Sequence, residues 1–232
     1  MSAANRKLVI AIDGPAGAGK STIASRLAKA LGYVTLESGA MYRALALKAI
    51  EGGIAAEDGA ALLALAERST IDLEPTSEGN RVLLDGCDVS GRIRERNVTD
   101  AASRVSTHPA VREWMVNRQR AMGAQGGVIM EGRDIGTVVF PNADVKIFLD
   151  ADPSVREGRR VTQANAQDDP ARAEKLKQDL RERDLRDTTR AAAPLKAAED
   201  AIHIDSSALT IEQVIARAEQ IVSEKLLASK IG

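Results

Sequence analysis

A glycine-rich motif between an apolar strand and a helix is the feature that most constrains this sequence. Residues 14–21 read Gly-Pro-Ala-Gly-Ala-Gly-Lys-Ser, which fits the pattern G-x-x-x-x-G-K-[ST]. A strand is expected over 7–12, because Leu-Val-Ile-Ala-Ile is a continuous apolar run, and a helix is expected over 20–31. Glycines in such a turn let backbone N–H groups surround phosphate oxygens at a helix N-terminus. The motif therefore predicts a triphosphate site, with Lys20 on the β- and γ-phosphates and the Ser21 hydroxyl on Mg²⁺.

Apolar runs and helical patterns alternate along most of the remaining chain. Further buried strands are expected over residues 127–130, 145–149 and 201–204. Helices are expected over residues 57–68 and 108–122 and from 211 onward. Another helix is expected from Ser38, which would cap it, to the glycines at 52 and 53.

The middle of the chain has a different character. Short strands at 70–73 and 81–84 predict a hairpin joined by the polar residues 75–80, and the polar segment 86–100 is interpreted as an insertion. The strands and helices that alternate on either side of this insertion predict an α/β protein. We expect a three-layer P-loop fold with a central parallel sheet. We expect one domain over residues 1–232, with a substrate-binding insertion at about 38–125 and a mobile lid at about 154–190.

Composition excludes several classes of protein. The chain has 32 Lys and Arg against 33 Asp and Glu, which argues against a nucleic-acid or anionic-membrane partner, because both require excess basic charge. One cysteine, Cys87, and two histidines, His108 and His203, cannot form a disulfide framework or a zinc site, so a reduced, cytoplasmic compartment is expected. We expect no membrane span, no secretory signal at the N-terminus and a monomeric protein.

The phosphate motif alone leaves the type of reaction open. GTPase switches, ATP-driven machines and small-molecule kinases all use it. The sequence lacks an Asn-Lys-x-Asp tetrapeptide for reading guanine, and its one D-x-x-G match, at 88–91, lies in the polar insertion rather than after a buried strand. At 232 residues the chain also lacks room for a coupled mechanical domain.

Arginines placed beside acids favour a kinase. Glu131, Arg133 and Asp134 follow the strand at 127–130, at the edge where open α/β sheets bind ligands. Carboxylates there can orient hydrated Mg²⁺ or accept hydrogen bonds from a substrate amino group, while Arg133 can bind a phosphate. Residues 156–190 hold ten basic and eight acidic residues, typical of a solvated helix face. Beside a triphosphate, however, arginines on a mobile flap suit phosphoryl transfer.

Five segments of the sequence resemble the bacterial cytidylate kinases of the longer type, which have an enlarged substrate-binding insertion. They are GPAGAGKST, ESGAMYRALAL, EGRDIGTVVFPNADVKIFLDA, RERDLRDTTRAAAPL and DAIHIDSSALTIEQV. The resemblance covers nearly the whole chain in the same order. It implies transfer of the ATP γ-phosphoryl group to CMP or dCMP, by in-line attack of an acceptor phosphate oxygen without a covalent enzyme intermediate.

The resemblance also implies which residues form the site. It places Ser103, Arg112 and Asp134 on the cytosine, with Ser38 nearby. It places the acceptor phosphate on Arg43, Arg94, Arg133 and Arg190, and the ribose on Arg183 and Asp187, with Tyr42 close to sugar and base. It places Arg159, Arg160 and Arg186 in the lid over the triphosphate. The phosphate cradle comprises Gly14, Pro15, Ala16, Gly17, Ala18, Gly19, Lys20, Ser21 and Thr22. The implied catalytic residues are Lys20, Arg133, Arg159, Arg160 and Arg186.

Other interpretations stay open at this point. A kinase for UMP, AMP or shikimate would share the phosphate motif, and Asp134 with Arg112 is the feature that argues against it. An ATP-binding regulatory module would bind ATP without acceptor-dependent turnover. Among the site residues, Ser38 and Tyr42 also fit purely structural roles as a helix cap and a core-edge aromatic, and Arg112 could border a core stripe.

Overall fold

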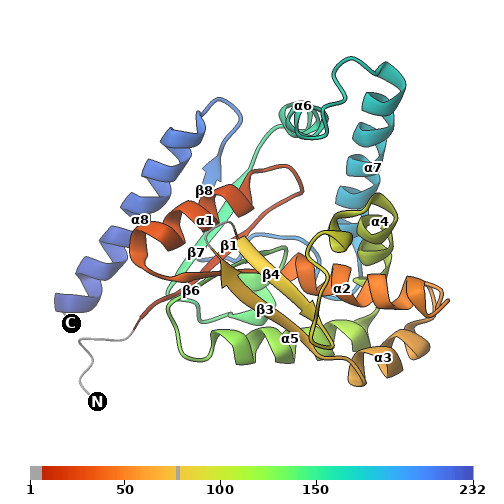
Figure 1. The fold of residues 1–232 in the computed structure, drawn as a ribbon. Helices are drawn as coiled ribbons and strands as arrows, with labels where there is room; N and C mark the ends of the chain where they lie inside the picture. Colours follow the sequence, from red (N-terminus) through yellow and green to blue (C-terminus); the bar gives the residue numbers. More distant parts are fainter. Residues whose placement is uncertain (1–6, 77–78, 232) are drawn as a thin grey trace.

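A five-stranded parallel sheet forms the centre of the molecule (Figure 1). The computed structural model describes residues 7–76 and 79–231. Residues 1–6, for which the absence of a secretory signal was expected, lie outside these ranges. Residues 77 and 78, which belong to the hairpin connection expected at 75–80, also lie outside them. The strand order is β2-β6-β1-β7-β8. The strands are β1 (Val9–Asp13), β2 (Val34–Glu37), β6 (Val128–Gly132), β7 (Val145–Asp150) and β8 (Ile202–Asp205).

Helices cover both faces of this sheet. Because successive side chains of a strand point to opposite faces, Ile10 and Ile12 of β1 belong to one apolar core and Ala11 belongs to the other. Helices α1 (Lys20–Leu31) and α8 (Ile211–Ile231) pack on the first face. Helices α2 (Ser38–Glu51), α3 (Gly59–Glu67), α4 (Arg96–Val105) and α5 (Pro109–Gly123) build the core on the second. The expected three-layer α/β fold with a central parallel sheet is confirmed.

A small antiparallel sheet lies beside the edge strand β2. It contains β3 (Ile71–Thr76), β4 (Gly79–Leu84) and β5 (Cys87–Asp88), so the expected hairpin exists with longer strands. Asn80 holds it against β2, because its side chain donates to the Thr35 carbonyl at 2.7 Å and accepts from the Glu37 N–H at 3.0 Å.

The structure differs from the sequence-based expectations at three places. Strand β2 was not predicted, because its four residues bury one apolar side chain, Leu36, and give no pattern. The segment expected as an insertion contains a short helix, η2 (Arg92–Arg94), and the start of α4, which buries Val98 and Ala101 on one face among charged residues. Ser38 does begin α2, but instead of capping it, its hydroxyl donates to the Glu131 carbonyl at 2.7 Å.

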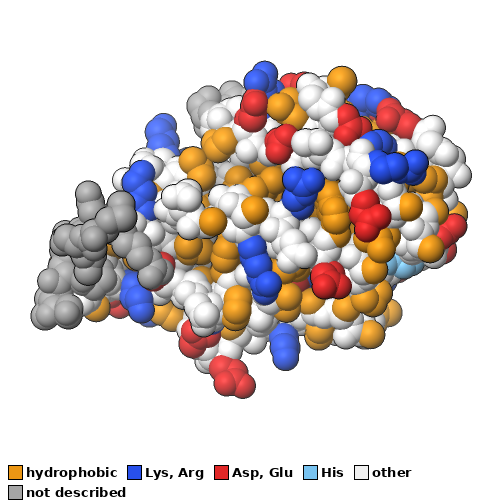
Figure 2. All heavy atoms as spheres, turned by 90° about the horizontal axis from the view of Figure 1, so that it is seen from below, with side chains coloured by type: hydrophobic (Ala, Val, Ile, Leu, Met, Phe, Trp, Pro, Cys, Tyr) orange, Lys and Arg blue, Asp and Glu red, His pale blue; other side chains and the backbone are white. Residues whose placement is uncertain are grey.

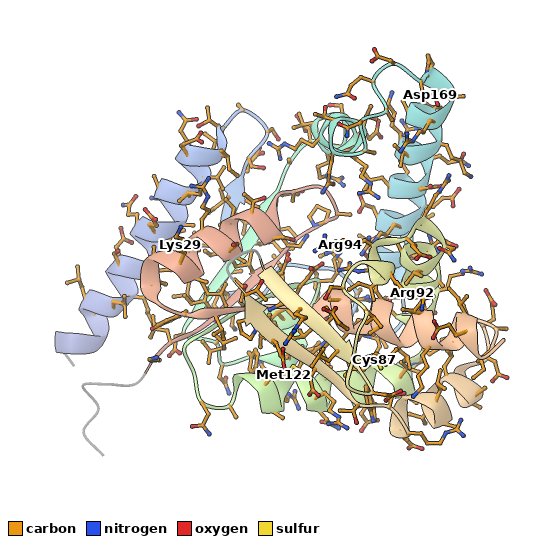
Figure 3. The ribbon with its side chains drawn as sticks, in the orientation of Figure 1. Lys29, Cys87, Arg92, Arg94, Met122 and Asp169 are labelled. Atoms are coloured by element: carbon orange, nitrogen blue, oxygen red, sulfur yellow. The ribbon has the colours of Figure 1, made fainter. Side chains whose placement is uncertain are left out.

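Two charged helices, α6 (Pro153–Gln163) and α7 (Pro170–Thr189), rise above the carboxyl edge of the sheet (Figure 1). Asp169 lies at the upper tip (Figure 3) and caps α7 by accepting from the Arg172 N–H at 3.0 Å. Most of their side chains are exposed, as expected of a solvated segment, and the buried exceptions are Arg156, Leu176, Leu180 and Asp187. The mobility of this lid stays a prediction.

Charges on the lower face alternate in sign between scattered apolar side chains (Figure 2). The described residues of that face therefore form no continuous basic patch. Across the described ranges, helices long and apolar enough to cross a membrane are absent.

The turn from β1 into α1 depends on Gly14. Its φ is +150°, and a Cβ there would lie 1.9 Å from the Leu149 carbonyl oxygen. We expect Gly14→Ala to lower the free energy of unfolding by more than about 3 kcal/mol, since steric overlap adds to backbone strain. Gly53→Ala is a matched control, with a φ of +65° but open space around it, and should lose only about 1 kcal/mol. Equal losses for both variants in urea unfolding would contradict this account.

Candidate active site

The phosphate loop connects β1 to α1 at the carboxyl edge of the sheet. Gly14, Gly17 and Gly19 have positive φ values of 150°, 78° and 100°, which allow the loop to wrap around a central space. Lys20 begins α1 and its ammonium donates to the Pro15 carbonyl at 2.7 Å, within the loop. Burial, with a further contribution from the Arg133 charge, lowers the pKa of Lys20 to about 7. An anion in the loop would therefore stabilise a lysine that is poorly compensated without one.

This pKa predicts how triphosphate binding depends on pH. A bound triphosphate favours charged Lys20, so above about pH 7 the complex holds more protons than the free protein. Affinity should therefore fall as pH rises from about 7 toward the higher pKa of the complex. Calorimetry at about pH 8, in two buffers that differ in ionisation enthalpy, should show proton uptake of up to about one per site. Binding heats that do not depend on the buffer would contradict the prediction.

Side-chain oxygens lie close to Lys20 in the cleft. Glu131 is buried near the end of β6, and its pKa is raised by burial and by Glu37, against the influence of Lys20 and a hydrogen bond with Ser21. Burial also raises the pKa of Glu37, but Arg43 and Arg94 outweigh it and hold the pKa below its usual value. Two carboxylates and a hydroxyl are the hard oxygen donors that Mg²⁺ prefers, so this group of residues fits a magnesium ion.

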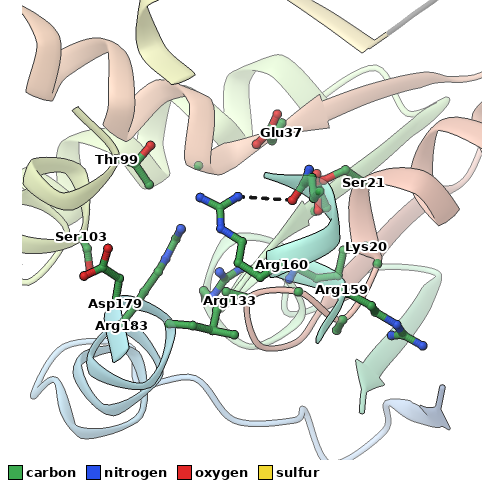
Figure 4. Close-up of a pocket in the computed structure, with 18 of the residues that line it drawn as sticks. Lys20, Ser21, Glu37, Thr99, Ser103, Arg133, Arg159, Arg160, Asp179 and Arg183 are labelled. Atoms are coloured by element: carbon green, nitrogen blue, oxygen red, sulfur yellow. Dashed lines mark hydrogen bonds between the residues drawn. The ribbon is translucent and has the colours of Figure 1, made fainter. Parts of the chain in front are cut away.

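A cleft of about 1340 Å³ extends from the phosphate loop to α4 and α7 (Figure 4). Lys20 and Ser21 lie on one side of it, and Arg133, Arg183 and Ser103 lie toward the other. The structure therefore brings residues from both ends of the chain to one space, although the expected roles of these residues stay predictions.

Buried and half-buried arginines outnumber the carboxylates that pair with them. Arg133 donates to Asp187 at 2.8 Å, and Arg183 and Arg190 lie 4.0 and 3.7 Å from the same carboxylate. Burial alone raises the pKa of Asp187, but these three guanidinium groups hold it below the usual value. Burial lowers the pKa of Arg183 to about 10, with the Arg133 charge acting in the same direction. The cluster therefore favours an incoming anion.

A smaller hollow of about 50 Å³ adjoins the cleft and contains the residues expected to read a base. Arg112 of α5 pairs with Asp134, donates to the Ser106 carbonyl at 3.0 Å, and lies 5.5 Å from the centre of the Tyr42 ring. Arg190 lies 3.6 Å from the other Asp134 oxygen. The lining of this hollow includes Ser38, Tyr42, Ser103, Arg112, Asp134 and Arg190.

Some groups in this hollow have no hydrogen-bond partner in the described part of the chain. The Ser103 hydroxyl and the Arg112 Nε are buried without a hydrogen-bond partner among the described residues. Because buried polar groups are normally satisfied, these atoms indicate a polar ligand. Burial raises the pKa of Tyr42 to about 12, so its hydroxyl stays protonated.

The expected lid arginines occupy three different places. Arg160 extends into the cleft (Figure 4), and Arg159, which also lines the cleft, donates to the Ser206 carbonyl at 2.8 Å. Arg186 lies 3.4 Å from Asp100 on α4, across the cleft. Arg94 is exposed, in η2 at the cleft rim.

Two contributors to the site were missed from the sequence. Glu37 ends β2, and without that strand its place at the sheet edge could not be seen. Arg156 pairs with Asp184 and donates to the Ala16 carbonyl at 3.1 Å, linking both lid helices to the phosphate loop. Within the charged run, neither partner carried a signal that distinguished it from its neighbours.

A parallel three-layer fold, a phosphate loop and an arginine-lined cavity beside it define the P-loop kinases of small phosphate-bearing acceptors. The chain belongs to the cytidylate kinase family, whose model, described as cytidylate kinase, matches residues 10–224. It is 49% identical to the cytidylate kinase of Geobacillus kaustophilus over 95% of this chain and 99% of the relative.

Two further relatives show the same similarity in other organisms. The cytidylate kinase of Pelotomaculum thermopropionicum is 51% identical over 89% of this chain and 92% of its own length. That of Pasteurella multocida is 43% identical over 96% of this chain and 98% of its own length.

Proposed function

We propose that this protein transfers the γ-phosphoryl group of ATP to CMP or dCMP, producing ADP and CDP or dCDP. The observation that carries the proposal is the polar hollow that adjoins the cleft, where Asp134, Arg112 and Ser103 converge. The relatives named cytidylate kinase support the same activity.

Cytosine is the base whose hydrogen bonds suit this hollow. It carries an exocyclic amino donor beside the N3 and O2 acceptors, so a carboxylate must accept and an arginine must donate. Asp134 and Arg112 supply that pair, with the Ser103 hydroxyl free to bond either way. Uracil reverses the pattern at two positions and would leave the buried pair badly matched, which favours strong discrimination.

The acceptor phosphate and ribose would occupy the arginine cluster next to the hollow. Arg133 and Arg190 already share Asp187, so a dianionic phosphate would complete their charge balance together with Arg43 and the rim residue Arg94. Asp187 and Arg183 are then close enough to the hollow to bind the sugar.

Catalysis would consist of positioning and charge stabilisation. The attacking CMP phosphate oxygen is already anionic, so no general base is required. Lys20, Arg133 and Arg160 face the space between loop and acceptor site, where negative charge spreads over the transferring group. Magnesium would be held by the Ser21 hydroxyl and the ATP phosphates, with Glu131 facing it, and when bound it neutralises phosphate charge.

The remaining lid arginines would serve the donor nucleotide. Arg159 is fixed on Ser206, next to the half-exposed Leu209 and Ile211 at the end of the cleft, where the donor base would lie. Arg186 would reach the triphosphate only after leaving Asp100. The cytoplasmic location and the monomeric state expected from the sequence stay predictions.

The proposal is tested by ADP release from Mg-ATP with CMP, dCMP, UMP, AMP or no acceptor, compared side by side. Release that depends on CMP and dCMP, and is at least about 100-fold slower with the other acceptors, is expected. Release without an acceptor, or tight ATP binding without turnover, would favour the ATP-binding regulatory module instead.

A further inference from the structure

We infer that Asp13 is a specificity-determining positioning residue, which fixes the place of Asp134 in the base-reading hollow. The inference rests on the proposed function, since it concerns how the same hollow selects a base. Asp13 itself does not line that hollow or the cleft.

The geometry around Asp13 spans the residues that it would position. Its backbone pairs in register with Gly132 at the end of β6. Its two carboxylate oxygens accept from the Ile135 N–H at 2.8 Å and the Gly136 N–H at 2.7 Å. Arg133 and Asp134 lie between these two anchor points, so one residue of β1 holds the chain immediately before and immediately after them.

The anchored turn leaves little space for adjustment. A Cβ on Gly132 would lie 2.5 Å from the Ser38 hydroxyl and 2.7 Å from the Ile135 side chain. A Cβ on Gly136 would lie 3.2 Å from the Lys146 side chain and 3.3 Å from the Asp13 carboxylate. A change in the anchor must therefore be transmitted along the backbone to Asp134 rather than absorbed by a void.

The ionised carboxylate of Asp13 is unfavourable at this buried position. Burial raises its pKa to about 6, while the two backbone N–H donors act in the opposite direction. The charged groups around it are Asp134, which raises the pKa further, Lys20, which lowers it, and Lys146, which packs on Gly136. Since a buried carboxylate without an ion-pair partner is unfavourable, its hydrogen bonds to the turn are the interaction that it provides in this structure.

Asp13→Asn tests the inference with little change in shape. The amide keeps one acceptor but turns an NH₂ group toward the other backbone N–H, so that donor is left unsatisfied and the turn shifts. We expect the CMP to UMP ratio of kcat/KM to fall about 10-fold and KM for CMP to rise, while the Kd for ATP changes less than about 2-fold.

Two further variants complete the experiment. Gly136→Ala presses on the same contact without altering the Asp13 charge and should shift the ratio in the same direction. If thermal melting shows that Asp13→Asn does not fold, Gly136→Ala provides the test alone. Asp150→Asn is the matched control, because Asp150 ends the neighbouring strand β7 and its carboxylate accepts from the adjacent Ala151 N–H at 2.8 Å, away from the turn. Its ratio should equal that of the wild type.

The outcomes separate the inference from the proposed function. If the wild-type protein itself shows no preference for CMP, the proposed function fails, and the inference falls with it. If the wild type prefers CMP and both turn variants keep the full preference, the positioning role of Asp13 is overturned. The same conclusion follows if both variants lose kcat/KM equally with every acceptor and also bind ATP more weakly.

Discussion

Replacing Lys20 with alanine is expected to abolish phosphoryl transfer to every acceptor, with a loss in kcat on the order of 10³-fold or more. Lys20 is the buried cation inside the phosphate loop, and its ammonium lies among backbone groups that a triphosphate would contact. It acts on the donor side of the reaction, so the loss should not depend on the acceptor base.

A matched control for this variant lies on the same helix. Lys29 is exposed near the C-terminal end of α1 (Figure 3), and Lys29→Ala should keep wild-type kcat with CMP. Steady-state rates with CMP and dCMP at saturating ATP measure both variants. Retention of more than about a tenth of wild-type kcat in Lys20→Ala would show that the loop cation does not stabilise the transferring group.

Asp134→Asn is expected to reduce kcat/KM for CMP by about 100-fold or more while leaving the Kd for ATP within about 2-fold. The amide cannot balance Arg112 and Arg190, both of which lie against the Asp134 carboxylate in a buried hollow. Its single oxygen cannot accept from both the arginines and the cytosine amino group, so one of these donors would face an NH₂ group.

The readout that identifies base reading is the comparison between acceptors. Because Asp134 contacts the base in this account, Asp134→Asn should lower kcat/KM more with CMP than with UMP. The ratio of the two kcat/KM values should therefore move toward one. Asp72→Asn, an exposed residue of β3, is the control and should leave both values unchanged. Equal losses with CMP and UMP would assign Asp134 to the stability of the site rather than to its specificity.

The central part of the fold was predictable because its signals are local. A continuous apolar strand, a glycine turn and a helix lie within residues 7–31, and this unit fixes the position of the phosphate loop. Strand β2 and helix α4 were missed because a four-residue edge strand and a charged amphipathic helix produce weak patterns. Long-range packing, rather than local preference, determines both elements.

Long-range pairing also explains what was missed in the site. Asp13 bonds to residues more than 100 positions away along the chain, and only the order of the strands reveals that these residues are neighbours. Residues named through the family resemblance, such as Ser103 and Arg112, come together in one hollow, although their positions in the sequence gave no reason for it. The lid role of Arg159 likewise came from the family resemblance, and it stays a prediction, since in this structure the side chain donates to Ser206.

The fate of a labelled γ-phosphoryl group tests the central claim most directly. Mg-ATP labelled at the γ-position is incubated with CMP and the protein, and the products are separated and counted. The account predicts that the label appears in CDP in proportion to the ADP formed, and that replacing CMP with UMP nearly eliminates the transfer. Label recovered as inorganic phosphate, or transferred equally well to UMP, would contradict it.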